Sequence, residues 1–265
     1  MDGAMQMETR MTNHSQTIQN QFDPQAQAYL LSTVHAAGED LARAAAIVAA
    51  AIPCETGKLL DVGCGAGHLS FAVSPHLSRV VAADPSPGML DAVRQGADDR
   101  GQTIEAVRAS AGDLPFDEGA FCVVASRYSA HHWLGLEAAM REMRRVVKTG
   151  GYLLMIDVLG DEDDLVNTHL QTMELLRDRS HIRNLKASQW RALIGASGFQ
   201  LVEEAAYRLP LEFSSWVGRM RTSPQRIGMI RTLEDEAPAE VREALKISAD
   251  GSFELQTGLF WARAV

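Results

Sequence analysis

The feature that most constrains the fold is a glycine-rich turn that directly follows a short apolar strand. The strand is predicted over Lys58 to Val62, and the turn continues as GCGAG from Gly63 to Gly67. A parallel strand that is buried on both faces has a short, continuous apolar sequence of this kind. Glycines at alternate positions let the backbone turn tightly and approach a ligand, because no Cβ intervenes. The segment therefore predicts a strand, turn and helix at the start of an α/β sheet.

A second apolar strand ends in an acidic residue. Residues 80–83 read VVAA and are followed by Asp84. In doubly wound sheets, an acid at the carboxyl end of the second strand binds ribose hydroxyls. The dinucleotide fingerprint Gly-x-Gly-x-x-Gly places its third glycine inside the helix. Here His68 occupies that position and the third glycine, Gly67, comes one residue earlier. The segment predicts a nucleoside pocket that differs from the dinucleotide type.

Short apolar segments alternate with helical ones from residue 58 to residue 158, a pattern typical of right-handed βαβ units and a mostly parallel sheet. Gly150 and Gly151 are expected to end a helix and to begin a strand over 152–157. Two more strands are expected over 199–207 and 253–264. Apolar residues at helical spacing predict helices over 22–30, 38–52, 136–148, 165–176 and 190–198.

Residues 209–252 separate the last two predicted strands and are too many for an ordinary hairpin. We expect this insertion and the segment 160–190 to cover the substrate site of a single domain that spans residues 18–265. Residues 1–17 are polar and show no apolar periodicity, so we expect a disordered tail.

Charge and composition disfavour several classes of function. The net charge of −9 and the pI of about 5.4 argue against a general nucleic-acid-binding protein, which normally has a basic face. No segment approaches the roughly 18 apolar residues that cross a bilayer. The N-terminus lacks a secretory signal, so a cytoplasmic location is expected. The cysteines at positions 54, 64 and 122 lack metal-ligand spacing, so no metal site is predicted.

Four motifs in order resemble those of the class I S-adenosylmethionine (SAM) methyltransferases, and in particular the ubiquinone and menaquinone methyltransferase-like branch of small-molecule enzymes. They are the turn at residues 63–67, DPSPGML at 84–90, AGDLPF at 111–116 and FCVVAS at 121–126. The resemblance covers about residues 20 to 160. It implies an α/β fold with a doubly wound, seven-stranded, mostly parallel sheet, an antiparallel last strand, N-terminal helices over the site and SAM as cofactor.

The resemblance also implies which residues bind the cofactor. Asp84 would bind the ribose hydroxyls, Ala111 would offer its backbone to adenine, and Ser126 would lie near the sulfonium. Many relatives have an aspartate just before the position of Ala111, where this chain has Ser110. The complete predicted cofactor set is Asp61, Gly63, Gly65, Gly67, Asp84, Ser86, Met89, Ala111 and Ser126.

A histidine pair follows the fourth predicted strand of the sheet. Methyl transfer depends mainly on alignment of the acceptor with the sulfonium methyl, and a base near neutral pH can take the acceptor's proton. Ligands bind beyond the carboxyl ends of the strands at the switch point, where residues 126–133 read SRYSAHHW. His131 or His132 is therefore predicted to be the base. The alternative is that either ring only packs locally.

Several residues are predicted to contact the acceptor. Arginines after the helix over 165–176 and after Trp216 favour an anionic or phenolic small molecule, and the apolar content of residues 213–229 favours an apolar part. The alternatives are solvated arginines and core packing. The insertion could also form the surface of a homodimer. The predicted substrate set is Tyr29, Arg127, Tyr128, Arg183 and Trp216.

Three other functions stay open on the sequence alone. A NAD-dependent dehydrogenase is disfavoured by the glycine spacing, and a SAM-binding regulatory or partner protein without turnover is disfavoured by the intact motifs. A macromolecular methyltransferase is disfavoured by the acidity and by the absence of an Asn/Asp-Pro-Pro-aromatic signature. The predicted function is methyl transfer from SAM to a small-molecule acceptor, with oxygen, nitrogen and carbon all open as the acceptor atom.

Overall fold

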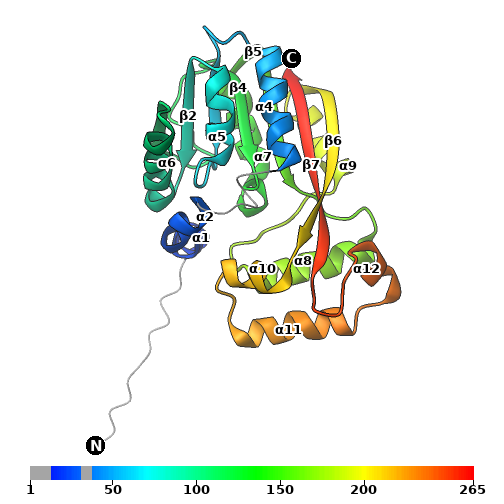
Figure 1. Ribbon diagram of the computed structural model, residues 1–265. Helices are drawn as coiled ribbons and strands as arrows, with labels where there is room; N and C mark the ends of the chain where they lie inside the picture. The colour runs from blue at the N-terminus through cyan, green and yellow to red at the C-terminus, as the bar shows by residue number, and fades with distance from the viewer. Residues whose placement is uncertain (1–12, 31–37) are drawn as a thin grey trace, which may run out of the picture.

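The computed structural model describes residues 13–30 and 38–265. Its centre is a seven-stranded sheet in the order β3-β2-β1-β4-β5-β7-β6 (Figure 1). Strands β1 to β5 run parallel, and β7 lies antiparallel between β5 and β6. The predicted fold class is confirmed. The strands are β1 (Lys58–Val62), β2 (Arg79–Asp84), β3 (Ile104–Arg108), β4 (Phe121–Arg127), β5 (Val147–Val158), β6 (Phe199–Leu211) and β7 (Phe253–Ala264).

Helices cover both faces of this sheet. Helices α4, α5 and α6 lie on one face, and α7 and α9 lie on the other (Figure 1). The helices are α1 (His14–Phe22), α2 (Ala26–Leu30), α4 (Glu39–Ala51), α5 (His68–Val73), α6 (Pro87–Arg100), α7 (Leu136–Val146), α8 (Asp164–Arg177), α9 (Ala187–Ala196), α10 (Phe213–Arg219), α11 (Pro224–Asp235) and α12 (Ala239–Ala244). No helix of the described chain has the length and apolar character needed to span a membrane.

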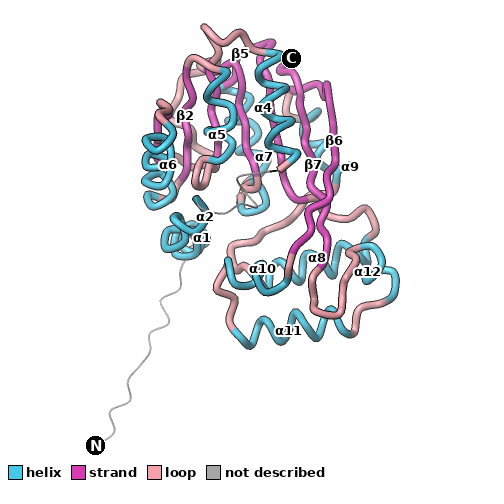
Figure 2. Tube along the Cα trace, in the orientation of Figure 1, coloured by secondary structure: helices cyan, strands magenta, loops and turns pink. Residues whose placement is uncertain are grey.

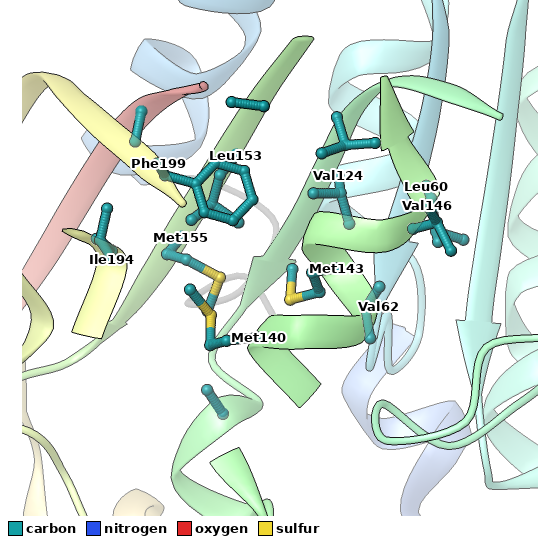
Figure 3. Close-up of a cluster of buried hydrophobic side chains, with 14 of the residues drawn as sticks. Leu60, Val62, Val124, Met140, Met143, Val146, Leu153, Met155, Ile194 and Phe199 are labelled. Atoms are coloured by element: carbon teal, nitrogen blue, oxygen red, sulfur yellow. The ribbon is translucent and has the colours of Figure 1, made fainter. Parts of the chain in front are cut away.

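Helix α7 shows how the sequence pattern forms the core. Met140, Met143 and Val146 recur at helical spacing and are fully buried. Figure 3 shows Met140 and Met143 directed toward the sheet, where Met155 of β5 belongs to the same apolar cluster. Burial of one such side chain stabilises the fold by about 1.5–3 kcal/mol. This packing holds the ends of β4 and β5 in place, and the loops of the site follow these strands.

The long pair β6 and β7 carries the predicted insertion away from the sheet. Strand β5 pairs with β7 only as far as Val158 opposite Thr257, whereas β6 and β7 pair further, to Leu211 opposite Phe253. Figure 2 shows this two-stranded ribbon running out of the sheet to a separate layer of helices, α8 and α10 to α12. Trp216 and Ile230 are buried in the apolar core of that layer. The layer therefore has its own packing and lies beyond the end of β5.

Several element boundaries differ from the predictions. Helix α7 ends at Val146, because Val147 already pairs with Phe121 of β4. Gly150 and Gly151 lie inside β5, at an irregularity of the register after which pairing with β4 resumes at Tyr152. Strand β6 continues to Leu211 because β7 pairs with it along its length. Helix α1 begins at His14, inside the segment expected to be a tail, and a capping box of Asn13 and Gln16 stabilises its first turn.

Candidate active site

A cavity of about 380 Å³ lies at the carboxyl ends of β1, β2 and β4. Strands β2 and β3 lie on one side of β1, and β4 and β5 lie on the other. The strand order therefore reverses at β1, which makes this the switch point of the sheet. One end of the cavity is formed by the glycine turn, Asp84 and the loop 110–112. The other end is formed by the loop after β4, helix α8 and the ribbon with α10. Helix α1 contributes His14, Ile18 and Phe22 to the wall.

The glycine turn has three residues in left-handed conformation, with φ of 65° at Gly63, 51° at Gly65 and 89° at Gly67. Gly63 and Gly65 line the cavity. A Cβ on Gly65 would have open space around it, whereas a Cβ on Gly63 would collide with the Ser129 side chain. A Cβ on Gly67 would press on Phe71 at 3.0 Å. The prediction that glycines shape a ligand pocket therefore fits Gly63 and Gly65, and Gly67 serves helix packing outside the cavity wall.

Replacement of Gly63 by alanine is expected to lower the free energy of unfolding by at least about 1–2 kcal/mol, because left-handed backbone is unfavourable for a residue with a Cβ and Ser129 must also move. Chemical denaturation measures the change. Gly112→Ala is the matched control, since a Cβ there meets nothing within 4 Å, and its effect should stay within about 0.5 kcal/mol. Equal effects of the two substitutions would contradict the steric explanation.

Asp84 closes the turn from the end of β2. Its Oδ2 accepts a hydrogen bond from the Gly65 amide at 2.9 Å, and its Oδ1 accepts one from the Ser86 amide at 2.9 Å. Burial raises the pKa of Asp84 to about 6, and the two amide bonds partly oppose this shift. Each carboxylate oxygen can accept more than one hydrogen bond. Asp84 can therefore bind ligand hydroxyls in the cavity while it holds the turn.

Asp61 presents a second buried carboxylate to the cavity from β1. Ser70 Oγ donates to its Oδ2 at 2.7 Å, and its Oδ1 has no hydrogen-bond partner among the described residues. Burial raises the pKa of Asp61 to about 7, and the bond from Ser70 opposes the shift. A buried carboxylate with one unpartnered oxygen is suited to bind a cationic group.

The remaining predicted cofactor residues divide into two groups. Met89 and Ala111 line the cavity, as does Ser110. Ser86 instead accepts a hydrogen bond from the Met89 amide at the start of α6, and its hydroxyl donates to Asp23. Ser126 is fully buried within β4 beside β5 and lies outside the cavity wall. Ser86 thus supports the pocket as the N-cap of α6. Ser126 does not line the cavity, so the structure does not support its predicted contact with the ligand.

His131 is paired with an acid that the sequence reasoning did not single out. His131 Nδ1 lies 2.6 Å from Asp157 Oδ1, and the His131 amide donates to Asp157 Oδ2 at 3.2 Å. Burial lowers the pKa of His131, but the charge of Asp157 and its hydrogen bond outweigh burial, so the net shift is upward from 6.5. A carboxylate only accepts hydrogen bonds, so Nδ1 carries the proton. Nε2 of the neutral ring is then an acceptor.

His132 has a different environment. Its Nδ1 lies 3.1 Å from the Ser180 carbonyl, and its ring packs edge-on against Phe22. Burial and the neighbouring charge of His131 lower the pKa of His132 to about 4. The His132 carbonyl accepts a hydrogen bond from His14 Nε2 at 2.9 Å. His132 therefore lines the cavity as a neutral ring that joins helix α1 to the loop after β4.

The structure separates the residues predicted to bind substrate. Arg127 and Tyr128 line the cavity, with Arg127 Nε 2.6 Å from Asp40 Oδ2 and its guanidinium above the Tyr128 ring. Trp216 lines the opposite end. Arg183 is exposed and lies outside the cavity wall, because the backbone amides of this turn, and not its side chain, face the His131 carbonyl. The side chain of Tyr29 falls outside the described residues.

Three polar residues near the end of α8 line the wall and were not singled out by the sequence reasoning. They are Glu174, Asp178 and Asn184, whereas Arg177 is one of the arginines that were expected after the helix over 165–176. A signal for Glu174 was present, because it occupies the buried face that Val166, Leu170 and Met173 define. A charged residue at an apolar-face position of a helix indicates a polar site.

Comparisons with known proteins agree with this geometry. The family described as "Methyltransferase domain" matches residues 60–155. YafE of Escherichia coli, described as an uncharacterized protein, is 41% identical over 72% of this chain and 93% of its own length. YcgJ of Bacillus subtilis, described as an uncharacterized methyltransferase, is 30% identical over 88% of this chain and 91% of its own length. The YcgJ crystal structure has a TM-score of 0.78 and covers 83% of this chain and 97% of that chain at 28% identity.

A more distant relative is named for a specific activity. The demethylmenaquinone methyltransferase of Clavibacter sepedonicus is 33% identical over 139 residues, which are 51% of this chain and 56% of that protein. This similarity is confined to part of each chain.

Proposed function

The chain belongs to the class I methyltransferases, and from this membership we propose that its cavity binds SAM beside a small organic acceptor and that His131 acts as the base. The observation that carries the proposal is the continuity of one cavity. It joins the carboxylates of Asp61 and Asp84 to the pair of His131 and Asp157. The acceptor atom can be oxygen, nitrogen or carbon.

The residues at the glycine-turn end fit SAM. The unpartnered Oδ1 of Asp61 suits the cationic amino group of the methionine part, and Asp84 retains acceptor capacity for the ribose hydroxyls. The open space at Gly65 admits a ligand close to the backbone. Met89 and Ala111 would flank the adenine. When bound, SAM supplies a methyl group on a positively charged sulfur, which needs no further activation.

The residues at the other end would hold the acceptor and receive its proton. Nε2 of His131 takes the proton of the acceptor, while Asp157 keeps the proton on Nδ1 and stabilises the imidazolium that forms. General-base catalysis of this kind contributes about 10²- to 10⁴-fold. The wall of Phe22, Trp133 and Trp216 excludes water from the acceptor.

A small-molecule acceptor is supported by the shape of the site. The cavity lies between the sheet and the helical layer, with side chains of α1, α8 and α10 in its wall. A small molecule fits such a site better than a folded macromolecule does. The partial similarity to demethylmenaquinone methyltransferase favours the same class of acceptor.

Titration calorimetry of the purified protein with SAM, S-adenosylhomocysteine (SAH) and NAD tests the cofactor. We expect binding of SAM and SAH and none of NAD. Asp84→Asn should weaken SAM binding by at least about tenfold, because a hydrogen bond to a charged group contributes about 1.5–3 kcal/mol. Asp98→Asn, an exposed acid on α6, is the control and should bind as the wild type does. Binding of NAD alone, or unchanged SAM affinity in Asp84→Asn, would refute the assignment.

A further inference from the structure

We propose that the methyl acceptor carries an oxyanion, a carboxylate or a phosphate, on an apolar body, and that Arg177 and Asn184 bind this oxyanion at the α8 end of the cavity. The inference rests on the proposed function, since it identifies the substrate class of the same site. It is carried by two buried donor groups in the wall and by the apolar surface beside them.

Arg177 is held in place with its outer donors available. Its Nε donates to the Trp216 carbonyl at 2.9 Å, and its guanidinium lies 5.1 Å from the centre of the Trp216 ring. These contacts fix the plane of a side chain that is only 13% exposed. Its Nη1 is 3.6 Å from Glu174 Oε2, beyond the 2.7–2.9 Å typical of a charge-assisted hydrogen bond. The Nη groups can therefore bind an oxyanion as a fork.

Asn184 provides the second donor. Its backbone amide donates to Gln171 Oε1 at 3.0 Å, and its carbonyl accepts from Gln171 Nε2 at 2.9 Å, so α8 holds its position. The residue is 1% exposed, and its Nδ2 has no hydrogen-bond partner within the described parts of the chain. A buried donor without a partner is unfavourable by about 1–3 kcal/mol. An acceptor oxygen from a ligand in the cavity would remove this penalty.

The two acids in the same wall have partners within the protein, and the pKa of Asp178 is lowered, so this carboxylate stays ionised. Asp178 accepts hydrogen bonds from the amide and the hydroxyl of Ser180, at 2.8 and 2.6 Å, and it faces His132. Glu174 is buried beside Arg177, and burial raises its pKa while the charge of Arg177 opposes this shift. Arg219 adds a further positive charge to this end from α10.

The surroundings of this polar group are apolar. Trp216 lies in the same wall together with four aliphatic side chains of the ribbon and the end of β5. These four are Val158, Leu209, Leu211 and Leu255. A ligand at this end is therefore bound by a small polar group and a larger apolar surface. Such a site selects an amphipathic molecule with one charged end.

The test uses SAH-saturated full-length protein titrated with benzoate, phenyl phosphate and benzamide. Benzamide has nearly the shape of benzoate and no charge. We expect at least one anion to bind about tenfold or more tightly than benzamide, as a charged hydrogen-bond pair predicts. Benzoate and phenyl phosphate distinguish a carboxylate from a phosphate as the preferred group. Arg177→Gln and the nearly isosteric Asn184→Asp should each reduce the preference to about threefold or less. Arg179→Gln removes an exposed arginine of the next turn and should retain the preference.

SAH affinity, measured first, separates the two proposals. If the wild-type protein does not bind SAH, the proposed function is refuted. Normal SAH binding with equal affinity for benzoate, phenyl phosphate and benzamide, or with no anion bound at millimolar concentration, would refute only the oxyanion site. If Asn184→Asp keeps the preference for anions over benzamide, the oxyanion site is refuted as well. This result is decisive even if Arg177→Gln does not fold.

Discussion

Replacement of Asp61 by asparagine is expected to stabilise the ligand-free protein and to weaken SAM binding at the same time. Asparagine keeps the shape and can still accept the hydrogen bond from Ser70, but it removes a buried charge whose pKa is raised to about 7. At pH 8 the free energy of unfolding should rise by about 2–4 kcal/mol, since each pKa unit corresponds to about 1.4 kcal/mol. SAM affinity should fall by about 30- to 100-fold. Denaturation and calorimetry measure the two changes.

The pH dependence of this stability difference has a definite sign. The pKa of Asp61 is higher in the folded protein than its ordinary value of 3.8. The ionised carboxylate is therefore unfavourable in the fold, and the contribution of Asp61 to stability is complete below pH 3.8 and is lost as pH rises through about 7. The advantage of Asp61→Asn over the wild type should grow from pH 4 to pH 8. A difference that is constant with pH, or a less stable variant, would contradict the account.

Loss of the proposed general base, His131, should cause the largest change in turnover. His131→Ala is expected to reduce kcat/KM by about 10²- to 10⁴-fold, the range for removal of a general base. SAH binding should persist, because His131 lies at the acceptor end of the cavity. Turnover is measured as transfer of labelled methyl from SAM to a panel of small hydroxylated carboxylic acids. His132→Gln is the comparison and should cause a clearly smaller loss, since His132 is neutral and packs against Phe22.

Asp157→Asn separates a positioning role from a merely structural one. Wild-type activity should rise with pH through the pKa of His131, which lies above 6.5 because Asp157 favours the imidazolium. Without that charge, burial dominates and lowers the pKa of His131. The activity rise should then move to lower pH while the plateau falls. Titration of the His131 ring by NMR measures the same shift without an acceptor. If the pKa of His131 is unchanged in Asp157→Asn, the pairing with Asp157 is not the cause of the raised pKa.

The position of the helical layer explains how one enzyme fold can acquire its own substrate. The sheet and the glycine turn present the cofactor end in much the same way wherever this fold occurs. The β6–β7 ribbon continues past the end of β5 and carries α10, while α8 follows β5 and packs against α11 and α12, and both α8 and α10 contribute to the cavity wall. The wall of the acceptor end thus comes from elements that can vary without disturbing the sheet.

Most of the residues proposed to bind the cofactor could be selected from the sequence, because they lie close together in the chain. Strand, turn and acid recur with fixed spacing, and the left-handed backbone at Gly63 and Gly65 requires glycine, so the residue types report the local conformation directly. The alternation of strands and helices likewise predicted the order and type of the elements around the sheet, whereas helices α10 to α12 of the insertion were not predicted. Around the sheet the differences concern boundaries such as Val146, where the pairing of Val147 with Phe121 ends the helix earlier than the local pattern predicts.

The acceptor half could be recognised only in the folded protein. His131 pairs with Asp157 across 26 residues, and Arg177 is oriented by the Trp216 carbonyl 39 residues away. These contacts depend on how α8 and the ribbon pack against the sheet, and no local spacing encodes that packing. The same packing leaves Arg183 in solvent although its neighbour Asn184 is buried. Local backbone requirements were readable from the chain, whereas the side chains that meet across the cavity were selected by tertiary contacts.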